Sequence, residues 1–332
     1  MKVLFIGGTG VISRAVSRQA IDRGFELSAL NRGSELHPAG STHLAADINR
    51  TGDLYAVLEG KKFDVVVDWI AYAPGDIDRD VALFKDRVGQ YVFISSASAY
   101  QRPPASYLIT ELTPLSNPYS EYARGKITCE ERLMQAYREQ GFPATIVRPS
   151  LTYDRNFPIA IGGKGCYTLA QRILDGHPII AHGDGSSLFV VTHADDFARG
   201  FLGLLGNACA VGEAFHITSD EVLTWNQIYE TIAQELGTEA RIVHISSDFI
   251  SQVAPQLSAN LLGDKTWSLV FDNSKIKNFV PDFEATISFN EGVRRTVAWF
   301  REDRARRRID ESVNREMDRI LSIYSGECVT DP

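Results

Sequence analysis

Two residues suited to proton transfer stand close together in the stretch SEYARGK. Tyr122 and Lys126 are four apart, and Tyr122 alone among the twelve tyrosines has a lysine at this offset. On a helix, this spacing places both side chains on one face. A nearby ammonium favours the phenolate, so the spacing predicts a pKa for Tyr122 below the usual value of about 10. Tyr122 is therefore a candidate catalytic acid and base.

Three serines follow the apolar stretch YVFI. Ser95, Ser96 and Ser98 come directly after what reads as a buried strand. If that strand belongs to a parallel sheet, their hydroxyls lie at the ligand-binding edge and can donate hydrogen bonds to a substrate oxygen. Together with Tyr122 and Lys126, they indicate oxidation or reduction of a hydroxyl or carbonyl beside a nicotinamide.

A glycine-rich turn interrupts the first apolar run, in VLFIGGTGVIS at residues 3 to 13. Gly7 permits a tight strand-to-helix turn, and Gly10 lets backbone amides approach a pyrophosphate at the positive end of the helix. Ser13 stands where a third glycine is usual. The spacing predicts a dinucleotide-binding loop.

Short apolar strands alternate with helical segments over the first 150 residues. Strands that are apolar on both faces and separated by helices predict a doubly wound parallel α/β sheet, the Rossmann fold. We expect residues 1–150 to form the dinucleotide-binding domain, with segments near 188–218 returning to it, the VVTH strand included. Residues 151–332 should mainly form a smaller α/β substrate-binding domain.

The second strand ends in Asn31-Arg32, where NAD-binding proteins usually carry an acidic residue for the ribose hydroxyls. A guanidinium there suits a 2′-phosphate, so we predict an NAD(P) cofactor with NADP favoured over NAD. Asp47 is placed to accept a hydrogen bond from adenine, although its position equally suits an ordinary turn aspartate.

Composition narrows the choice of partners. The net charge of −8 gives no reason to expect nucleic acid, and no apolar run is long enough for a membrane helix. Cysteines 129, 166, 209 and 328 are scattered, and the histidines do not cluster, which predicts neither a metal site nor a disulfide framework. We therefore expect a cytoplasmic enzyme with a small-molecule substrate.

The combination of GGTG, SSASAY, YxxxK and VRPS resembles the extended short-chain dehydrogenase/reductases of the NAD-dependent epimerase/dehydratase superfamily. NRG at 31–33 and VRPSLTYD at 147–154 are similar to the atypical branch with chloroplast stem-loop-binding-like proteins. The resemblance implies a catalytic triad of Ser96, Tyr122 and Lys126, with Lys126 also on the nicotinamide ribose. It further implies a homodimer and cofactor contacts from Gly7, Gly10, Ser13, Asp47 and Ala71.

Three departures from the family pattern bear on the substrate. Ser98 stands where family dehydratases carry a glutamate base, so dehydration by that route is disfavoured. Phe189 occupies the position of an arginine that grips a substrate diphosphate. Either Arg155 or Arg172 substitutes, or the substrate carries no diphosphate. TYDRNFP replaces the usual GP after the VRP strand.

These residues lead to three functional hypotheses. The first is an epimerase/dehydratase-type enzyme acting on a sugar or nucleotide sugar, with Tyr153, Asp154 and Arg155 as candidate substrate contacts. The second is a net reductase or dehydrogenase that uses NADP as a dissociating cosubstrate. The third is a non-catalytic dinucleotide-sensing or RNA-associated protein, which the net charge and the intact serine, tyrosine and lysine set oppose.

Overall fold

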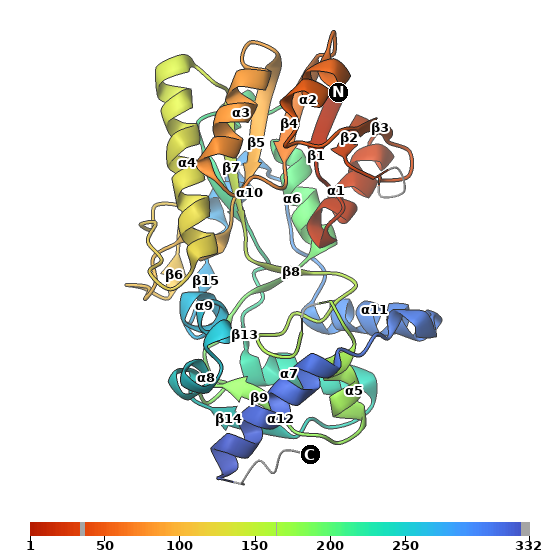
Figure 1. Ribbon diagram of the computed structural model, residues 1–332, viewed down its shortest axis with the longest axis vertical. Helices are drawn as coiled ribbons and strands as arrows, with labels where there is room; N and C mark the ends of the chain where they lie inside the picture. Colours follow the sequence, from red (N-terminus) through yellow and green to blue (C-terminus); the bar gives the residue numbers. More distant parts are fainter. Residues whose placement is uncertain (34–36, 164, 327–332) are drawn as a thin grey trace.

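A parallel sheet of seven strands forms the upper part of the molecule (Figure 1). The computed structural model describes residues 1–33, 37–163 and 165–326. The strand order is β12-β7-β5-β4-β1-β2-β3. From β1 the chain first adds β2 and β3 on one side and then crosses to add β4, β5, β7 and β12 on the other side. The strands are β1 Lys2–Ile6, β2 Glu26–Asn31, β3 Thr42–Ala45, β4 Phe63–Asp68, β5 Val88–Ile94, β7 Ala144–Pro149 and β12 Ala214–Ile217. The predicted doubly wound fold is confirmed.

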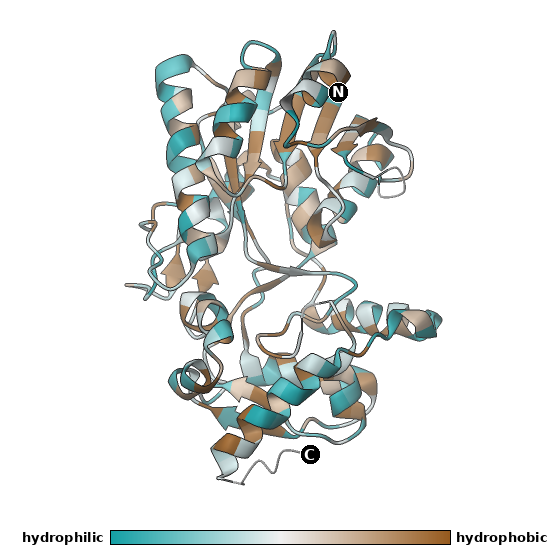
Figure 2. Ribbon diagram, viewed as in Figure 1, coloured by the Kyte–Doolittle hydropathy of each residue, from teal (hydrophilic) through white to brown (hydrophobic). Residues whose placement is uncertain are grey.

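Helices cover both faces of this sheet, because successive strand residues point in opposite directions. On one face, Val3 and Phe5 pack against α1 (Val11–Asp22) and α6 (Ala194–Leu204). On the other face, Leu4 and Ile6 pack beneath α2 (Thr51–Leu58), α3 (Pro74–Phe84) and α4 (Glu121–Gln140). The strands are accordingly hydrophobic between helices of mixed polarity (Figure 2).

The lower part of the molecule is built from short strand pairs and helices. Its strands are β8 Leu151–Tyr153, β9 Ile179–His182, β10 Leu188–Phe189, β11 Val191–His193, β13 Leu223–Thr224 and β14 Ile242–Ile245. Its helices are α5 Thr168–Leu174, α7 Trp225–Leu236, α8 Ser247–Val253, α9 Ser258–Asn260, α11 Phe289–Glu302 and α12 Glu311–Ser325. The remaining elements are β6 Leu108–Ile109, which pairs with β15 Val270–Phe271, and α10 Ser274–Phe279.

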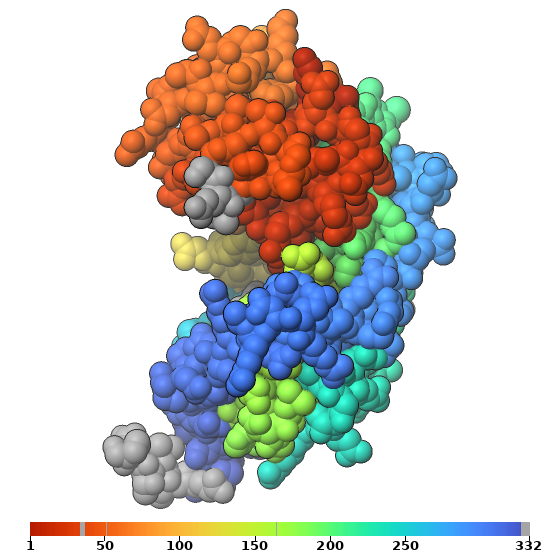
Figure 3. Space-filling model, turned by 90° about the vertical axis from the view of Figure 1, so that its right-hand side faces the viewer, coloured from red at the N-terminus to blue at the C-terminus, as the bar shows by residue number. Residues whose placement is uncertain are grey.

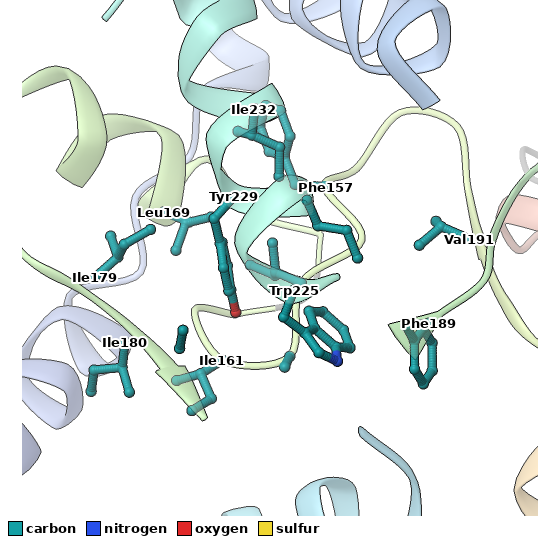
Figure 4. Packing of buried hydrophobic residues seen from close by; sticks show 14 of the residues in the cluster. Phe157, Ile161, Leu169, Ile179, Ile180, Phe189, Val191, Trp225, Tyr229 and Ile232 are labelled. Carbon is teal, nitrogen blue, oxygen red and sulfur yellow. The ribbon is translucent and has the colours of Figure 1, made fainter. Parts of the chain in front are cut away.

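Helix α7 organises the hydrophobic core of this lower part. Trp225, Tyr229 and Ile232 project from one side of α7 toward Phe189 and Ile180 of the neighbouring strands (Figure 4). The Trp225 ring lies 5.0 Å from that of Phe189. Phe189 is therefore a core residue, 1% exposed, and does not reach the solvent.

One strand predicted for the main sheet lies elsewhere. The VVTH segment forms β11, which pairs in parallel with β8 and not with a strand of the seven-stranded sheet. The prediction that VVTH rejoins the main sheet was wrong. The backbone groups of β11 pair with those of β8, which follows β7 along the chain, instead of with a strand of the main sheet. Helix α6, which follows, does return to cover the main sheet, and β12 forms its edge.

The surface is hollowed between the N-terminal segments and the C-terminal segments, as Figure 3 shows on one face of the molecule. The carboxyl ends of the sheet strands face this hollow. In the described part of the chain, none of the helices has the length and apolar character needed to cross a membrane. Cys129, Cys166 and Cys209 are free thiols, while Cys328 lies outside the described residues.

We expect Gly7→Ala to destabilise the protein more than Gly24→Ala does. Both glycines have positive φ, +83° and +78°, so alanine at either costs about 1–2 kcal/mol. A Cβ on Gly7 would also meet Cγ2 of Ile70 at 2.7 Å, whereas one on Gly24 meets nothing within 4 Å. Urea unfolding of the two variants measures the difference, and equal losses would show that the Ile70 contact is unimportant.

Candidate active site

A cleft of about 900 Å³ lies between the sheet and the lower part of the molecule. The sheet side contributes the glycine turn, the ends of β5 and β7, and the start of α4. The opposite wall comes from the segments around residues 152–159 and 259–265. This is the edge where parallel α/β sheets bind ligands, because the strand carboxyl ends and helix N-termini converge there.

The glycine turn forms one end of the cleft. Gly8, Gly10 and Ser13 line it, while Gly7 lies behind them against Ile70. Gly10 is the N-cap of α1, and Ser13 closes the turn by accepting from the Gly10 amide at 2.9 Å. No acidic side chain occupies the first turn of α1. The open backbone at a helix N-terminus fits the pyrophosphate of a dinucleotide.

Lys126 is buried at the centre of the site, with only 2% of its surface exposed. Its Nζ donates to the carbonyl oxygens of Ala71 at 2.7 Å and Ile94 at 2.8 Å. Burial lowers the pKa of Lys126 to about 8, and the negative charge of Asp68 opposes that shift. The side chain therefore joins α4 to the ends of β4 and β5 and keeps its charge at neutral pH.

Tyr122 stands half-exposed in the cleft, one turn from Lys126 on α4. Desolvation by the cleft walls raises the pKa of Tyr122 to about 12, Tyr72 raises it further, and a hydrogen bond with Ser96 lowers it. The prediction of a lowered pKa was wrong for this state of the protein. The Lys126 ammonium binds two backbone carbonyls and lies 5.8 Å from the centroid of the Tyr122 ring.

The serines of the SSAS stretch face different partners. Ser96 lies in the cleft, where its hydroxyl is 2.8 Å from that of Ser98 and bonds Tyr122. Ser95 instead donates at 2.5 Å to the buried carboxylate of Glu130. Arg148 on β7 pairs with the same carboxylate at 2.6 Å. This buried pair fixes α4 against the sheet behind the cleft.

Asn31 and Arg32 lie at the end of β2, beyond the lining of the cleft. Arg32 is exposed, and Oδ1 of Asn31 accepts from Nε2 of His43 at 2.9 Å and from the Gly33 amide at 3.3 Å. Asp47 lies in the turn before α2, where its carboxylate accepts from the Asn49 amide at 3.0 Å. Among the described residues, the β2 end thus presents an arginine and an amide but no carboxylate.

The candidate substrate residues at the end of β8 and just after it lie away from the cleft. Tyr153 is buried, and its hydroxyl donates to the carbonyl of Phe289 at 3.3 Å. Asp154 and Arg155 form a loose pair at 3.7 Å, with neither lining the cleft. Their neighbours Thr152 and Asn156 line it instead. Three successive side chains, at residues 153 to 155, thus lie away from the site.

The wall opposite Tyr122 includes a single turn of π-helix, Leu261–Lys265. Lys265 pairs with Asp264 at 2.5 Å and lies 4.6 Å from the centroid of the Phe189 ring. Asn117 donates to the Gly263 carbonyl at 2.8 Å, and His182 donates to that of Lys265 at the same distance. These side chains hold the turn in place, because the last carbonyls of a helix have no donor within the helix.

Neither arginine proposed as a substitute for the missing family arginine reaches the cleft. Arg172 is buried and binds Asp318 at 2.6 Å and the Pro178 carbonyl at 3.0 Å. Arg155 packs over Trp299. Among the described residues, those that line the cleft include Lys126 and Lys265 but no arginine.

Sequence reasoning missed the residues that form the opposite wall, notably Asn260, Asp264 and Lys265. They lie about 140 residues beyond Tyr122 in a segment with no recognisable motif. Only the isolated glycine of LLGDK hinted at a close backbone approach, which the structure shows between Gly263 and Ser120.

The sheet, the glycine turn and the Ser96–Tyr122–Lys126 cluster define an extended short-chain dehydrogenase/reductase. The model of the NAD dependent epimerase/dehydratase family matches residues 3–218. The chain belongs to this family.

Its relatives include enzymes with several reactions. The chain is 26% identical over 292 residues to the 2′-dehydrokanamycin reductase of Streptomyces kanamyceticus, covering 86% of this chain and 80% of the relative. It is 25% identical over 264 residues to the chloroplast stem-loop binding protein of 41 kDa b of Arabidopsis thaliana, covering 73% and 65%. The UDP-glucose 4-epimerase of Thermotoga maritima, solved with UDP-glucose, has a TM-score of 0.73 at 20% identity, covering 91% and 99%.

We expect the efficiency kcat/KM for the dinucleotide to fall above about pH 8. Lys126 is protonated below its pKa of about 8, and the neutral amine formed above it lacks the charge that we expect to hold the cofactor. In the free enzyme, this group should reduce kcat/KM tenfold for each further pH unit. A profile that stays flat to pH 9.5 would show that the charge on Lys126 is not needed.

Proposed function

We propose that this enzyme transfers hydride between NAD(P) and a carbon that carries a hydroxyl or carbonyl in a sugar-like substrate. The observation that carries the proposal is the meeting of Tyr122, Ser96 and Lys126 in the same cleft as the open glycine turn. Proton transfer, oxygen binding and cofactor binding are then available within one cavity.

The residues present fit the dinucleotide. The backbone amides of Val11 and Ile12, in the first turn of α1, would hold the pyrophosphate, and Lys126 would hold the nicotinamide ribose. Bound there, the nicotinamide supplies or accepts the hydride. Ser96 holds the substrate oxygen by a hydrogen bond, and Tyr122 exchanges a proton with that oxygen at its phenolic Oη.

The protonation state of Tyr122 favours the reductive direction. With a pKa of about 12, the phenol keeps its proton at neutral pH. It can therefore give that proton to the oxygen of a carbonyl that is being reduced, without prior activation. In the oxidative direction, Tyr122 would first have to lose this proton, for which a cationic neighbour closer than Lys126 is in the free protein would be required.

The cleft favours a substrate without a diphosphate. Among the described residues no arginine lines it, Phe189 lies in the hydrophobic core, and Lys265 is already paired with Asp264. Neutral hydrogen-bonding groups, from Thr152, Asn156 and Asn260, suit a hydroxylated ring. The similarity to a reductase of an aminoglycoside supports this choice and favours net reduction as a second candidate beside epimerisation.

Dehydration is the least supported of the family reactions. It requires a base that removes a proton from carbon, and Ser98 stands where a carboxylate would act. The Ser98 hydroxyl is 2.8 Å from that of Ser96, which places it near the substrate oxygen but gives it no basicity. Among the described residues that line the cleft, the one carboxylate is that of Asp264, which lies on the wall opposite Tyr122.

Tyr122→Phe should lower kcat by about 10²–10⁴-fold, because it removes the proton donor. Dinucleotide affinity, measured by fluorescence titration with NADPH, should stay within a few-fold. Tyr72→Phe is the matched control: its ring lies 5.8 Å from that of Tyr122 in the same cleft, and it should retain activity. Full activity of Tyr122→Phe, with a panel of keto sugars as substrates, would contradict the proposed mechanism.

Arg32→Ala should weaken binding of NADPH by about tenfold and that of NADH by less than twofold. The guanidinium at the end of β2 would pair with the 2′-phosphate, which NADH lacks. Arg23→Ala removes the same charge at the other end of α1 and should leave both affinities unchanged. Equal losses for the two dinucleotides would mean that Arg32 does not select between them.

A further inference from the structure

A pair of buried carboxyl groups lies behind Lys126. Asp68 is the last residue of β4, Asp80 lies on α3, and neither is exposed. The proposed mechanism uses neither. Carboxylates are rarely buried without a partner, since desolvation of the charge is costly, so the pair requires an explanation.

Asp68 holds the turn that positions Lys126. Its Oδ1 accepts from the backbone amides of Ile70 at 2.6 Å and Ala71 at 2.9 Å. The carbonyl of Ala71 in turn accepts from Lys126 at 2.7 Å. Ile70 also packs against Gly7 of the glycine turn. One carboxylate oxygen thus fixes both Ala71, whose carbonyl binds Lys126, and Ile70, which packs against the glycine turn.

The second oxygen of Asp68 faces Asp80. Within the described residues, no amide, hydroxyl or ammonium group donates to Oδ2 of Asp68, and the Arg79 guanidinium is 3.7 Å away. Asp80 binds the same guanidinium, and two buried carboxyl groups beside a single cation favour a proton shared between them. Asp80 also accepts from the Tyr91 hydroxyl at 2.6 Å and from Nε of Arg79 at 2.8 Å.

The surrounding charges agree with a single proton on the pair. The charged and titratable groups facing the pair come from α3, the loop after β4, β5 and α4, and they are Arg79, Asp76, Tyr72, Tyr91 and Lys126. Cys129 and Glu130 on α4 also act on Lys126. Burial and the charge of Asp68 raise the pKa of Asp80 well above its usual value.

We propose that Asp68 and Asp80 share one proton and act together as positioning residues, with the negative charge on Asp68 keeping the Lys126 ammonium charged and in place. Asp80, as the acid partner, donates to Asp68 and so keeps a second charge out of the cluster. The consequence for catalysis rests on the proposed function, but the shared proton and its effect on Lys126 are properties of the protein without cofactor.

The first test is the pKa of Lys126 in the cofactor-free protein. It can be followed by NMR titration of protein with labelled lysine, with the Lys126 signal identified by its loss in Lys126→Arg. Asp68→Asn should lower this pKa by about one pH unit, because the nearest negative charge is gone. Asp80→Asn should leave it unchanged, because an amide can donate to Asp68 as the acid does.

Asp64→Asn is the matched control on the same strand. Its carboxylate accepts from the Lys2 amide at 2.7 Å, far from Lys126, and its removal should leave the Lys126 pKa unchanged. Two outcomes overturn the proposal. The first is a Lys126 pKa that is unchanged in Asp68→Asn. The second is an equal fall of the Lys126 pKa in Asp68→Asn and Asp80→Asn, which would mean that each carboxyl group carries its own charge.

A second measurement needs only Asp80→Asn and keeps the proposal testable if Asp68→Asn does not fold. The folded protein retains a proton on Asp80 that the unfolded chain releases above about pH 4, so this group weakens stability as the pH rises. The ratio of the unfolding constants, parent over Asp80→Asn, should therefore rise with pH above about pH 5, by up to tenfold per pH unit. A ratio independent of pH would overturn the shared proton.

These results separate the inference from the proposed function. Both measurements use protein without cofactor or substrate, so an active Tyr122→Phe variant would remove the proposed reaction and leave them unaffected. If both proposals hold, Asp68→Asn should shift the fall of kcat/KM to lower pH by the same amount as the Lys126 pKa, and Asp80→Asn should not shift it.

Discussion

The site depends on one buried ammonium and the groups that satisfy it. Lys126 donates to carbonyls at the ends of β4 and β5, so the helix that carries Tyr122 is fixed to two strands of the sheet by a single side chain. Removing an amine from water is costly, and the lowered pKa of Lys126 records that cost. The carboxylate of Asp68, which lies behind Lys126, offsets part of this cost because its negative charge favours the ammonium form.

The surrounding structure supports this interaction from two directions. On the sheet side, the Arg148–Glu130 pair and Ser95 hold α4 at a fixed height relative to β5 and β7. On the far side, Asn117 joins the backbone of Ser98 to that of Gly263, which ties the loop after β5 to the π-turn. The two walls of the cleft are therefore connected directly, and their spacing does not depend on hydrophobic packing alone.

The sequence predicts the parts of this arrangement that follow from local periodicity. The glycine turn, the alternating strands and the pairing of Tyr122 with Lys126 depend on spacings of a few residues, which helices and strands convert directly into position. The direction of the Tyr122 pKa shift could not be predicted, because it depends mainly on desolvation by the walls of the cleft, which tertiary folding brings together. Asp264 and Asp80 were also missed, since tertiary folding alone brings them to the site.

The most direct test of the account is the crystal structure of the protein with NADP(H). We predict the pyrophosphate against the amides of Val11 and Ile12, and the nicotinamide ribose within hydrogen-bonding distance of Lys126, with the nicotinamide beside Tyr122. A dinucleotide bound outside the cleft, or one whose nicotinamide lies away from Tyr122, would contradict the central claim that this tyrosine exchanges a proton where hydride is transferred.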